Sequence, residues 1–282
     1  MKKILMIVLM SALAFTLFAG GSQDSKMEEV KSVAMGGSTT VEPIVRSAIE
    51  AFEKVNPSYR LSYEAQGSSV GVQGAIDGVY VLGGASRELK SSEKEAGAVA
   101  IPIALDGIAV VVNKNVLLDS LSRTQIAKIY SGEFTNWKQV GGPDKPIIVI
   151  NRDEASGTRV AFHELVMVPE LGKEVQFYKD TIVVESNGDM VTKTGATPDS
   201  IGFCGFGYID KAISAGAKTL LVDGVEPTVD NVLNSVYPVS RKLNMVHKGQ
   251  VQAGTFEDLF LKYLLGKDGQ AIVEEEGFIA LP

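Results

Sequence analysis

Apolar and polar positions follow two different periods along this chain. Short runs of apolar and β-branched residues, such as 60–65 and 101–113, are typical of strands. Between these runs, segments such as 44–55 carry apolar residues every three or four positions, which is typical of amphipathic helices. Strands that alternate with helices predict an α/β protein with mixed, mostly parallel sheets and flanking helices.

The predicted strands are 32–35, 60–65, 79–83, 101–113, 147–150, 182–184, 201–204 and 220–222. The predicted helices are 44–55, 70–77, 122–130, 160–167, 189–194, 255–265 and 269–276. Chain crossings within 106–113 and near 237–241 would divide the molecule into two lobes with a cleft between them. Lobe 1 would comprise 32–108 plus 239–282, and lobe 2 would comprise 109–238.

The first 31 residues have a different pattern. Lys2 and Lys3 precede an apolar run that continues to Ala19, so we interpret 1–21 as a secretory signal peptide and 22–31 as a polar, flexible tether. The alternative, a permanent membrane anchor, calls for a longer apolar run. Gly20 and Gly21 stand where a lipoprotein signal carries its cysteine. We therefore expect a soluble protein, periplasmic or exported to the cell surface, rather than a lipid-tethered one.

Composition excludes several classes of function. The net charge of −7 argues against nucleic acid as a partner, but not against a small anion held by local hydrogen bonds. The single cysteine, Cys204, cannot form an internal disulfide and is expected to be a small core residue. The two histidines, His163 and His247, lack metal-ligand spacing. We expect no metal, no cofactor and no catalytic residue.

The segment 152–159, Arg-Asp-Glu-Ala-Ser-Gly-Thr-Arg, carries the most chemical information. It joins a predicted strand to a predicted helix, so backbone N–H groups and two hydroxyls would face one small volume at the positive end of the helix dipole. Such a place binds oxyanions, and Arg152 adds a planar fork of donors. Glu154 would accept a proton from an anion such as hydrogen phosphate. Alternatively, Ser156 only caps a helix and Arg152 with Glu154 forms a surface pair.

Two further turns favour the anion site. Segment 36–40, Gly-Gly-Ser-Thr-Thr, and segment 67–71, Gly-Ser-Ser-Val-Gly, also lie between a predicted strand and a predicted helix. In open α/β sheets, ligands bind at the carboxyl ends of the strands. We therefore expect these three turns to converge on one anion.

These motifs resemble the phosphate-binding proteins of bacterial phosphate ABC importers. The resemblance rests on 37–41, on Gly-Ala-Ser-Arg at 84–87, on 151–159, on Trp137 and on the closing segment 269–282, and it covers nearly the whole chain after the signal. It implies a two-lobed type II periplasmic-binding fold that holds inorganic phosphate in the interlobe cleft. The implied partner is an inner-membrane ABC permease complex, and we expect a monomer.

By motif position, the resemblance implies a set of phosphate ligands: Ser38, Thr39, Thr40, Ser68, Ser69, Ser86, Arg152, Ser156, Gly157 and Thr158. We add Asn187, which follows a predicted strand, and Glu154 as the proton acceptor. The sequence departs from some relatives at Arg87, where they carry an aspartate that accepts the proton of phosphate. Selectivity against sulfate would then rest on Glu154, Asp153 or another carboxylate.

Three alternatives remain open. The same fold could bind another oxyanion, such as sulfate or molybdate. The segment 67–71 also matches the Gly-x-Ser-x-Gly nucleophile elbow of serine hydrolases, with Ser69 as nucleophile. A hydrolase would need a histidine base, and neither histidine lies in a suitable signature. A surface adhesin or scaffold that keeps the fold without transport is the third.

Overall fold

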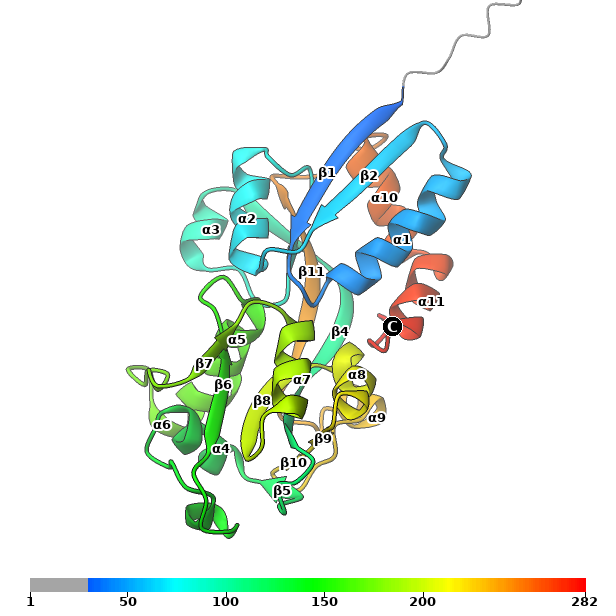
Figure 1. Ribbon diagram of the computed structural model, residues 1–282. Coiled ribbons are helices and arrows are strands. Elements are labelled where there is room, and N and C mark those ends of the chain that lie inside the picture. Colours follow the sequence, from blue (N-terminus) through cyan, green and yellow to red (C-terminus); the bar gives the residue numbers. More distant parts are fainter. Residues whose placement is uncertain (1–29) are drawn as a thin grey trace, which may run out of the picture.

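The computed structural model describes residues 30–282. The predicted signal peptide, 1–21, and nearly all of the predicted tether, 22–31, lie outside the described residues. The molecule has two lobes, one above the other in Figure 1, and two strands, β4 (Ala98–Asn113) and β11 (Ser240–Lys248), run between them.

The other elements divide between the lobes. The upper lobe contains β1 (Lys31–Gly37), α1 (Glu42–Val55), β2 (Tyr59–Glu64), α2 (Ser68–Asp77), β3 (Gly83–Ala85), α3 (Ser91–Glu95), α10 (Phe256–Leu265) and α11 (Lys267–Glu275). The strands of the lower lobe are β5 (Ser120–Leu121), β6 (Ile148–Arg152), β7 (Ile182–Val184), β8 (Ser200–Gly205), β9 (Ala217–Thr219) and β10 (Leu221–Val222). Its α-helices are α4 (Arg123–Tyr130), α5 (Gly157–Phe162), α6 (Val168–Leu171), α7 (Asn187–Ala196), α8 (Ile209–Ser214) and α9 (Val229–Leu233). Three further helical segments are the 3₁₀-helices η1 (Trp137–Val140) and η3 (Phe206–Tyr208) and the π-helix η2 (His163–Met167).

One sheet passes through both lobes. Its strand order is β2-β1-β3-β11-β4-β8-β6-β7, with β9 also paired to β4. Parallel pairs join β1 to β2 and β3, and β6 to β7 and β8. β11 and β4 are antiparallel to their neighbours. The predicted α/β class, with a mixed, mostly parallel sheet and flanking helices, is confirmed.

Helix α1 illustrates how the sequence pattern forms the upper lobe. Its apolar residues at helical spacing, from Ile44 and Val45 to Phe52, are buried, and Pro43 lies in the first turn, where no helical N–H is needed. The lower lobe has its own apolar core, which includes Trp137. The Trp137 indole Nε1 donates to the Asp199 carbonyl at 3.0 Å, so burial leaves no polar atom of the ring unpaired.

The strand β4 changes partner in the middle of its length. It pairs with β11 up to Gly107 and with β8 from Ile108 onward. We therefore keep the predicted lobe boundaries, after 108 and after 238, as a proposal that this change of partner supports. Within 30–282, no helix combines the length and the apolar character needed to span a bilayer.

The structure differs from the predicted secondary structure at β3 and β11, two strands that join the upper lobe to the rest of the sheet. Residues 79–82 form bends rather than a strand, because the backbone N–H groups of Val79 and Tyr80 both donate to the Gly74 carbonyl and close the end of α2. β11 was not predicted at all. Polar residues at 241, 242 and 244 interrupt its apolar pattern, although the strand is central in the sheet.

Candidate functional site

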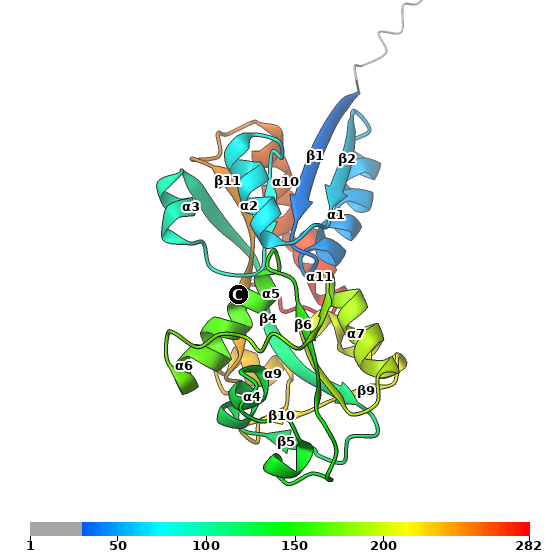
Figure 2. The same ribbon diagram turned by 60° about the vertical axis from the view of Figure 1, so that its left-hand side comes forward.

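Buried polar side chains gather where the two lobes face each other. Nine of them are at most 3% exposed, and together we call them the polar cluster: Ser38, Thr39, Thr40, Ser68, Ser86, Arg152, Ser156, Thr158 and Asn187. They follow or begin elements of both lobes, mainly at the carboxyl ends of β1, β3 and β6 (Figures 1 and 2). Burial of so many polar groups requires hydrogen-bond partners, which lie largely within the cluster.

The first turn, 38–40, connects β1 to α1. The Ser38 hydroxyl accepts from the backbone N–H groups of Thr40 at 3.1 Å and Val41 at 3.3 Å, which fixes the entry to the helix. The turn lies very close to β3, since the Ser38 N–H donates to the Gly84 carbonyl at 2.9 Å. Gly37 has φ +135°, and a Cβ there would lie 2.4 Å from that carbonyl oxygen. Only glycine fits at this position.

The second turn belongs to the same lobe. Ser68 begins α2, and its hydroxyl lies 3.2 Å from the Ser86 hydroxyl and accepts from the Ser86 N–H at 3.0 Å. Ser86 directly follows β3. The predicted residue Ser69 is half-buried, and its hydroxyl accepts from Nη2 of Arg87 at 3.4 Å. Of these two serines, Ser68 is therefore the member of the cluster and Ser69 lies at its edge.

The third turn comes from the other lobe. Ser156 caps α5 by accepting from the Arg159 N–H at 3.2 Å, so the simple capping role does exist. The next two residues touch the upper lobe. A Cβ on Gly157 would lie 2.1 Å from the Ser68 hydroxyl oxygen, and the Thr158 hydroxyl lies 3.0 Å from that of Thr40. The lobes are in direct contact at this turn.

Arg152 is the charged centre of the polar cluster. Its Nη2 donates to the Thr39 hydroxyl at 3.1 Å and to the Glu185 carbonyl at 2.8 Å. Its Nε and Nη1 are buried and have no hydrogen-bond partner within residues 30–282. Burial lowers the pKa of this guanidinium to about 10, and the neighbouring charge of Asp153 opposes that shift. At neutral pH the group is still charged and offers two unused donors.

Asn187 completes the contact between lobes. It begins α7 of the lower lobe, and its Nδ2 donates to the hydroxyls of Thr39 at 3.0 Å and Thr40 at 2.9 Å. Asn187, which was predicted from its place after a strand, thus contacts two hydroxyls of the first turn. These two bonds join residues that are separated by 148 and 147 positions in the sequence.

Glu154 is the predicted site residue that the structure does not bring into the cluster. Its side chain is exposed, and no hydrogen bond or ion pair in the described part of the chain involves it. The surface pair between Arg152 and Glu154 is absent there as well. The reason is local, since Arg152 ends a buried strand and Glu154 lies at the outer corner of the turn that follows. Its neighbour Asp153 is half-buried, with a buried Oδ1 that lacks a donor within residues 30–282.

Arg87 takes an inward position beside Ser86. Its side chain is fully buried and makes two short bonds to the Glu93 carboxylate, at 2.6 and 2.8 Å. Hydrogen bonds from Arg87 and Lys90 lower the pKa of Glu93, although its partial burial opposes them. The positive charge at this position is thus matched by a carboxylate.

Sequence reasoning missed an ion pair at the edge of the cluster. Asp106 of β4 and Arg241 of β11 are buried and paired, with Nη2 of Arg241 2.8 Å from Oδ2 of Asp106. Arg241 also donates to the Ser86 carbonyl at 2.8 Å. The sequence did contain a signal for a buried charge here, because Asp106 is the single charged residue in the apolar run 101–113.

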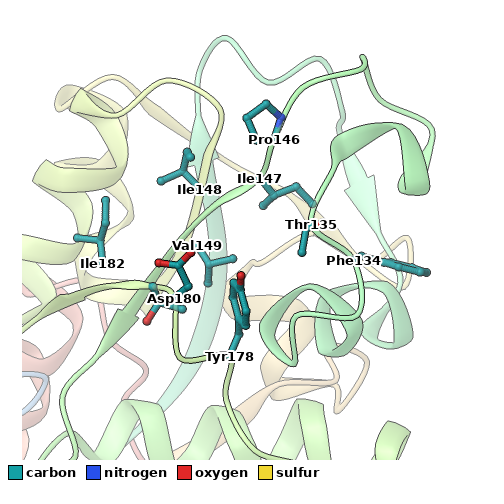
Figure 3. A pocket seen from close by; sticks show the side chains of 10 residues that line it. Phe134, Thr135, Pro146, Ile147, Ile148, Val149, Tyr178, Asp180 and Ile182 are labelled. Carbon is teal, nitrogen blue, oxygen red and sulfur yellow. The ribbon is translucent and has the colours of Figure 1, made fainter.

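A separate cavity of about 430 Å³ lies in the lower lobe, between β6 and the segment that leads into β7 (Figure 3). Tyr178 and Asp180 line it together with apolar residues of β6, and it shares no residue with the polar cluster. Its one charged side chain is a carboxylate. This cavity therefore lacks the cation that an anion site needs.

Two other predictions concern single residues. Cys204 is fully buried, which confirms it as a core residue, and burial raises the pKa of its thiol to about 12. The histidines lie elsewhere: Nε2 of His163 is 2.8 Å from the Val175 carbonyl, and Nδ1 of His247 is 3.1 Å from that of Gly249. In the described residues no hydrogen bond joins Ser69 to a histidine, so the base that a serine nucleophile needs is missing there.

Comparison with known proteins agrees with this architecture. Residues 22–268 match the family model described as a PBP superfamily domain. A phosphate-binding protein PstS of Borreliella burgdorferi is 35% identical over 283 residues, covering 100% of this chain and 99% of the relative. The PstS of Bacillus subtilis is 29% identical over 299 residues, covering 99% and 95%. A solved structure from Clostridium perfringens, described as a putative phosphate ABC transporter substrate-binding protein with bound phosphate, is 36% identical with TM-score 0.82, covering 89% and 100%.

Two lobes joined by β4 and β11, with a buried polar cluster between them, define the class of two-lobed binding proteins of the PBP superfamily. Within that class, the chain belongs to the family of PstS phosphate-binding proteins.

Proposed function

We propose that this protein captures inorganic phosphate between its lobes and delivers it to an inner-membrane ABC permease. The observation that carries the proposal is the Arg152 guanidinium, buried beside hydroxyls from both lobes with two nitrogens that find no acceptor in the described part of the chain. A buried donor without a partner costs free energy, so such an arrangement is retained where a ligand supplies the acceptor. The names of the relatives supply the ligand class.

The polar cluster offers donors suited to a tetrahedral anion. Two phosphate oxygens would take parallel N–H groups of Arg152, either Nε–H with Nη2–H or Nη1–H with Nη2–H. Nη2 would then exchange one of its bonds, to the Thr39 hydroxyl or the Glu185 carbonyl, for a bond to the anion. Hydroxyls of the turns at 38–40, 68, 86 and 156–158 would serve the remaining oxygens, as would the first backbone N–H groups of α5, which have no acceptor within the helix. The hydroxyl pair of Thr40 and Thr158 would exchange its mutual bond for bonds to the anion.

Calorimetric titration of the whole protein with phosphate, and separately with sulfate, tests the proposal. We expect one phosphate per chain and a clear rise in melting temperature, because a ligand at one hundred times its Kd stabilises the folded state by about 2.7 kcal/mol. Absence of any anion-induced rise would instead support an adhesin or scaffold that keeps the fold. Tight sulfate or molybdate binding without phosphate binding would support another oxyanion as the ligand.

Selectivity for hydrogen phosphate depends on a carboxylate that accepts its proton, and we assign that role to Asp153 in place of Glu154. In Asp106 and in Glu93, each of the two carboxylate oxygens already accepts a hydrogen bond. The Glu154 carboxylate is exposed. Asp153 retains one buried oxygen without a donor in the described part of the chain. A protonated ligand oxygen would satisfy it, whereas sulfate would be repelled.

The adjacent pair Asp153 and Glu154 allows a matched test of this assignment. Asp153→Asn should reduce the ratio of phosphate to sulfate affinity by about tenfold or more, since a hydrogen bond to a charged group contributes about 1.5–3 kcal/mol. Glu154→Gln should leave the ratio within about a factor of two, because an exposed charge is screened by solvent and salt. Competition calorimetry at one pH measures both ratios. The reverse order of effects would return the role to Glu154.

Other parts of the proposal concern where and how the protein acts. Export follows from the signal-like pattern of 1–21, and a binding role without catalysis is supported by relatives that are substrate-binding transport proteins. We propose a monomer, which light scattering of the purified protein tests directly.

A further inference from the structure

The buried ion pair between Asp106 and Arg241 lies where the chain passes from one lobe to the other. The two residues are direct partners in the antiparallel register of β4 and β11. One residue further along β4, Gly107 pairs with Ser240, the first residue of β11. From Ile108 onward, β4 pairs with β8 instead. Figures 1 and 2 show both strands running between the lobes at this point.

The pair is almost completely enclosed, with side chains 0% exposed for Asp106 and 4% for Arg241. Oδ2 of Asp106 accepts from Nε of Arg241 at 3.0 Å and from Nη2 at 2.8 Å. Oδ1 of Asp106 accepts from the Phe206 N–H of the lower lobe at 2.9 Å. Both carboxylate oxygens are therefore in use, and one of them is bound to the segment that follows β8.

The rest of the guanidinium is directed to the upper-lobe turns. Nη1 of Arg241 donates to the Ser86 carbonyl at 2.8 Å, and Nη2 lies 3.4 Å from the Thr40 hydroxyl. That same hydroxyl is the one that contacts Thr158 and Asn187 of the lower lobe. A continuous set of hydrogen bonds thus runs from Phe206 through the ion pair to the two upper-lobe turns and across to the lower lobe again.

Stability alone does not account for such a pair. Removal of two charges from water is costly, and well-packed apolar residues of similar volume commonly stabilise a fold as well or better. A planar guanidinium that holds three partners at once does, however, fix their relative positions. Here the partners are a strand that runs between the lobes and two turns, 38–40 and Ser86, that contribute four of the nine residues of the polar cluster.

We propose that Asp106 and Arg241 are positioning residues for anion capture, which hold the turns at Thr40 and Ser86 in the geometry that meets the lower lobe. This inference rests on the proposed function. The two residues are not proposed to contact phosphate themselves. The pair acts through Thr40 and Ser86, so its loss should weaken phosphate binding in addition to destabilising the fold, whereas a core truncation on the same strand should only destabilise the fold.

The test compares Arg241→Met with Leu243→Ala, a control on the same strand. Leu243 is fully buried in the upper core, so its truncation should lower the melting temperature of the ligand-free protein while phosphate affinity stays within about twofold of wild type. Arg241→Met should weaken phosphate binding about tenfold or more, because two turns lose a charge-assisted anchor. Asp106→Asn, which keeps the shape and one acceptor, should lie between wild type and Arg241→Met.

A double-mutant cycle on phosphate affinity separates positioning from a general loss of structure. If Arg241 acts through Thr40, the loss in Arg241→Met/Thr40→Val is smaller than the product of the two single losses. A double-variant loss equal to the product of the two single losses would overturn the proposal. So would an Arg241→Met affinity within twofold of wild type. Equal weakening by Leu243→Ala would do so too. If Arg241→Met does not fold, Arg241→Lys replaces it, since lysine keeps the charge but cannot hold three partners; its affinity is then expected to fall at least about fivefold. Wild-type protein that fails to bind phosphate at all would instead refute the proposed function.

Discussion

An Arg152→Ala variant is expected to bind phosphate at least about a hundredfold more weakly than the wild type. The variant loses two charge-assisted hydrogen bonds to the anion, each of about 1.5–3 kcal/mol. Calorimetric titration measures the change. Arg159→Ala is the matched control, since the Arg159 guanidinium lies over the Phe177 ring, 4.6 Å from its centroid, and its bond to Ser156 of the cluster is made by the backbone N–H, which alanine retains. We expect unchanged affinity for that control.

The same position should show a trade-off between stability and binding. The Arg152 guanidinium is buried with two nitrogens that have no acceptor within residues 30–282, and it contributes a desolvation cost that the anion would offset. Arg152→Met fills a similar volume without charge. Its melting temperature without phosphate is expected to equal or exceed that of the wild type, while the rise on adding phosphate disappears. An undiminished rise would remove Arg152 from the site.

Gly157→Ala is expected to reduce phosphate affinity by about tenfold to a hundredfold through a different cause. A Cβ at this residue would lie 2.1 Å from the Ser68 hydroxyl oxygen and 2.8 Å from that of Ser86, so the turns of the two lobes could not approach to their present distance. An anion held by both lobes would lose several of its hydrogen bonds at once. Calorimetry gives the affinity, and small-angle scattering with and without phosphate shows whether the lobes close.

Gly188→Ala is the corresponding control for Gly157→Ala. A Cβ on Gly188 would meet its nearest heavy atom, the Ser186 hydroxyl oxygen, at 3.6 Å, which is an ordinary contact. Both glycines lie near the beginning of a helix of the lower lobe, so the change in helix propensity is similar. Full affinity in Gly157→Ala would mean that phosphate binds without this close approach of the lobes.

All nine members of the polar cluster are among the residues predicted from the sequence, because they share a simple position. Ser38, Ser86 and Arg152 stand at or just after the carboxyl end of a strand, and the carboxyl ends of β1 and β3 in the upper lobe face that of β6 in the lower lobe. The chain pattern alone could not separate Asp153 from Glu154, however. Two acidic residues in one turn look equivalent until the turn geometry exposes one carboxylate and buries part of the other.

The pair of Asp106 and Arg241 could not be assigned for another reason. The two residues are separated by 135 positions, and their pairing depends on β11 lying between β3 and β4 in the sheet. Arg241 precedes Lys242 and Asn244 in a strand whose polar residues resemble a loop. Only the register of the strands shows that one of these polar side chains faces inward to a buried carboxylate.

The central place of β11 has a consequence for the order in which the molecule forms during synthesis. The N-terminal strands β1, β2 and β3 reach the rest of the sheet only through β11, which is made after all the strands of the lower lobe. The second half of β4 and the segment from β5 to β10 are continuous in the chain and supply most of the lower core before β11 is made. The upper lobe must wait for the last strand and the two closing helices, so a nascent chain lacking them exposes an unfinished β3 edge. Completion of the upper-lobe half of the polar cluster therefore depends on β11.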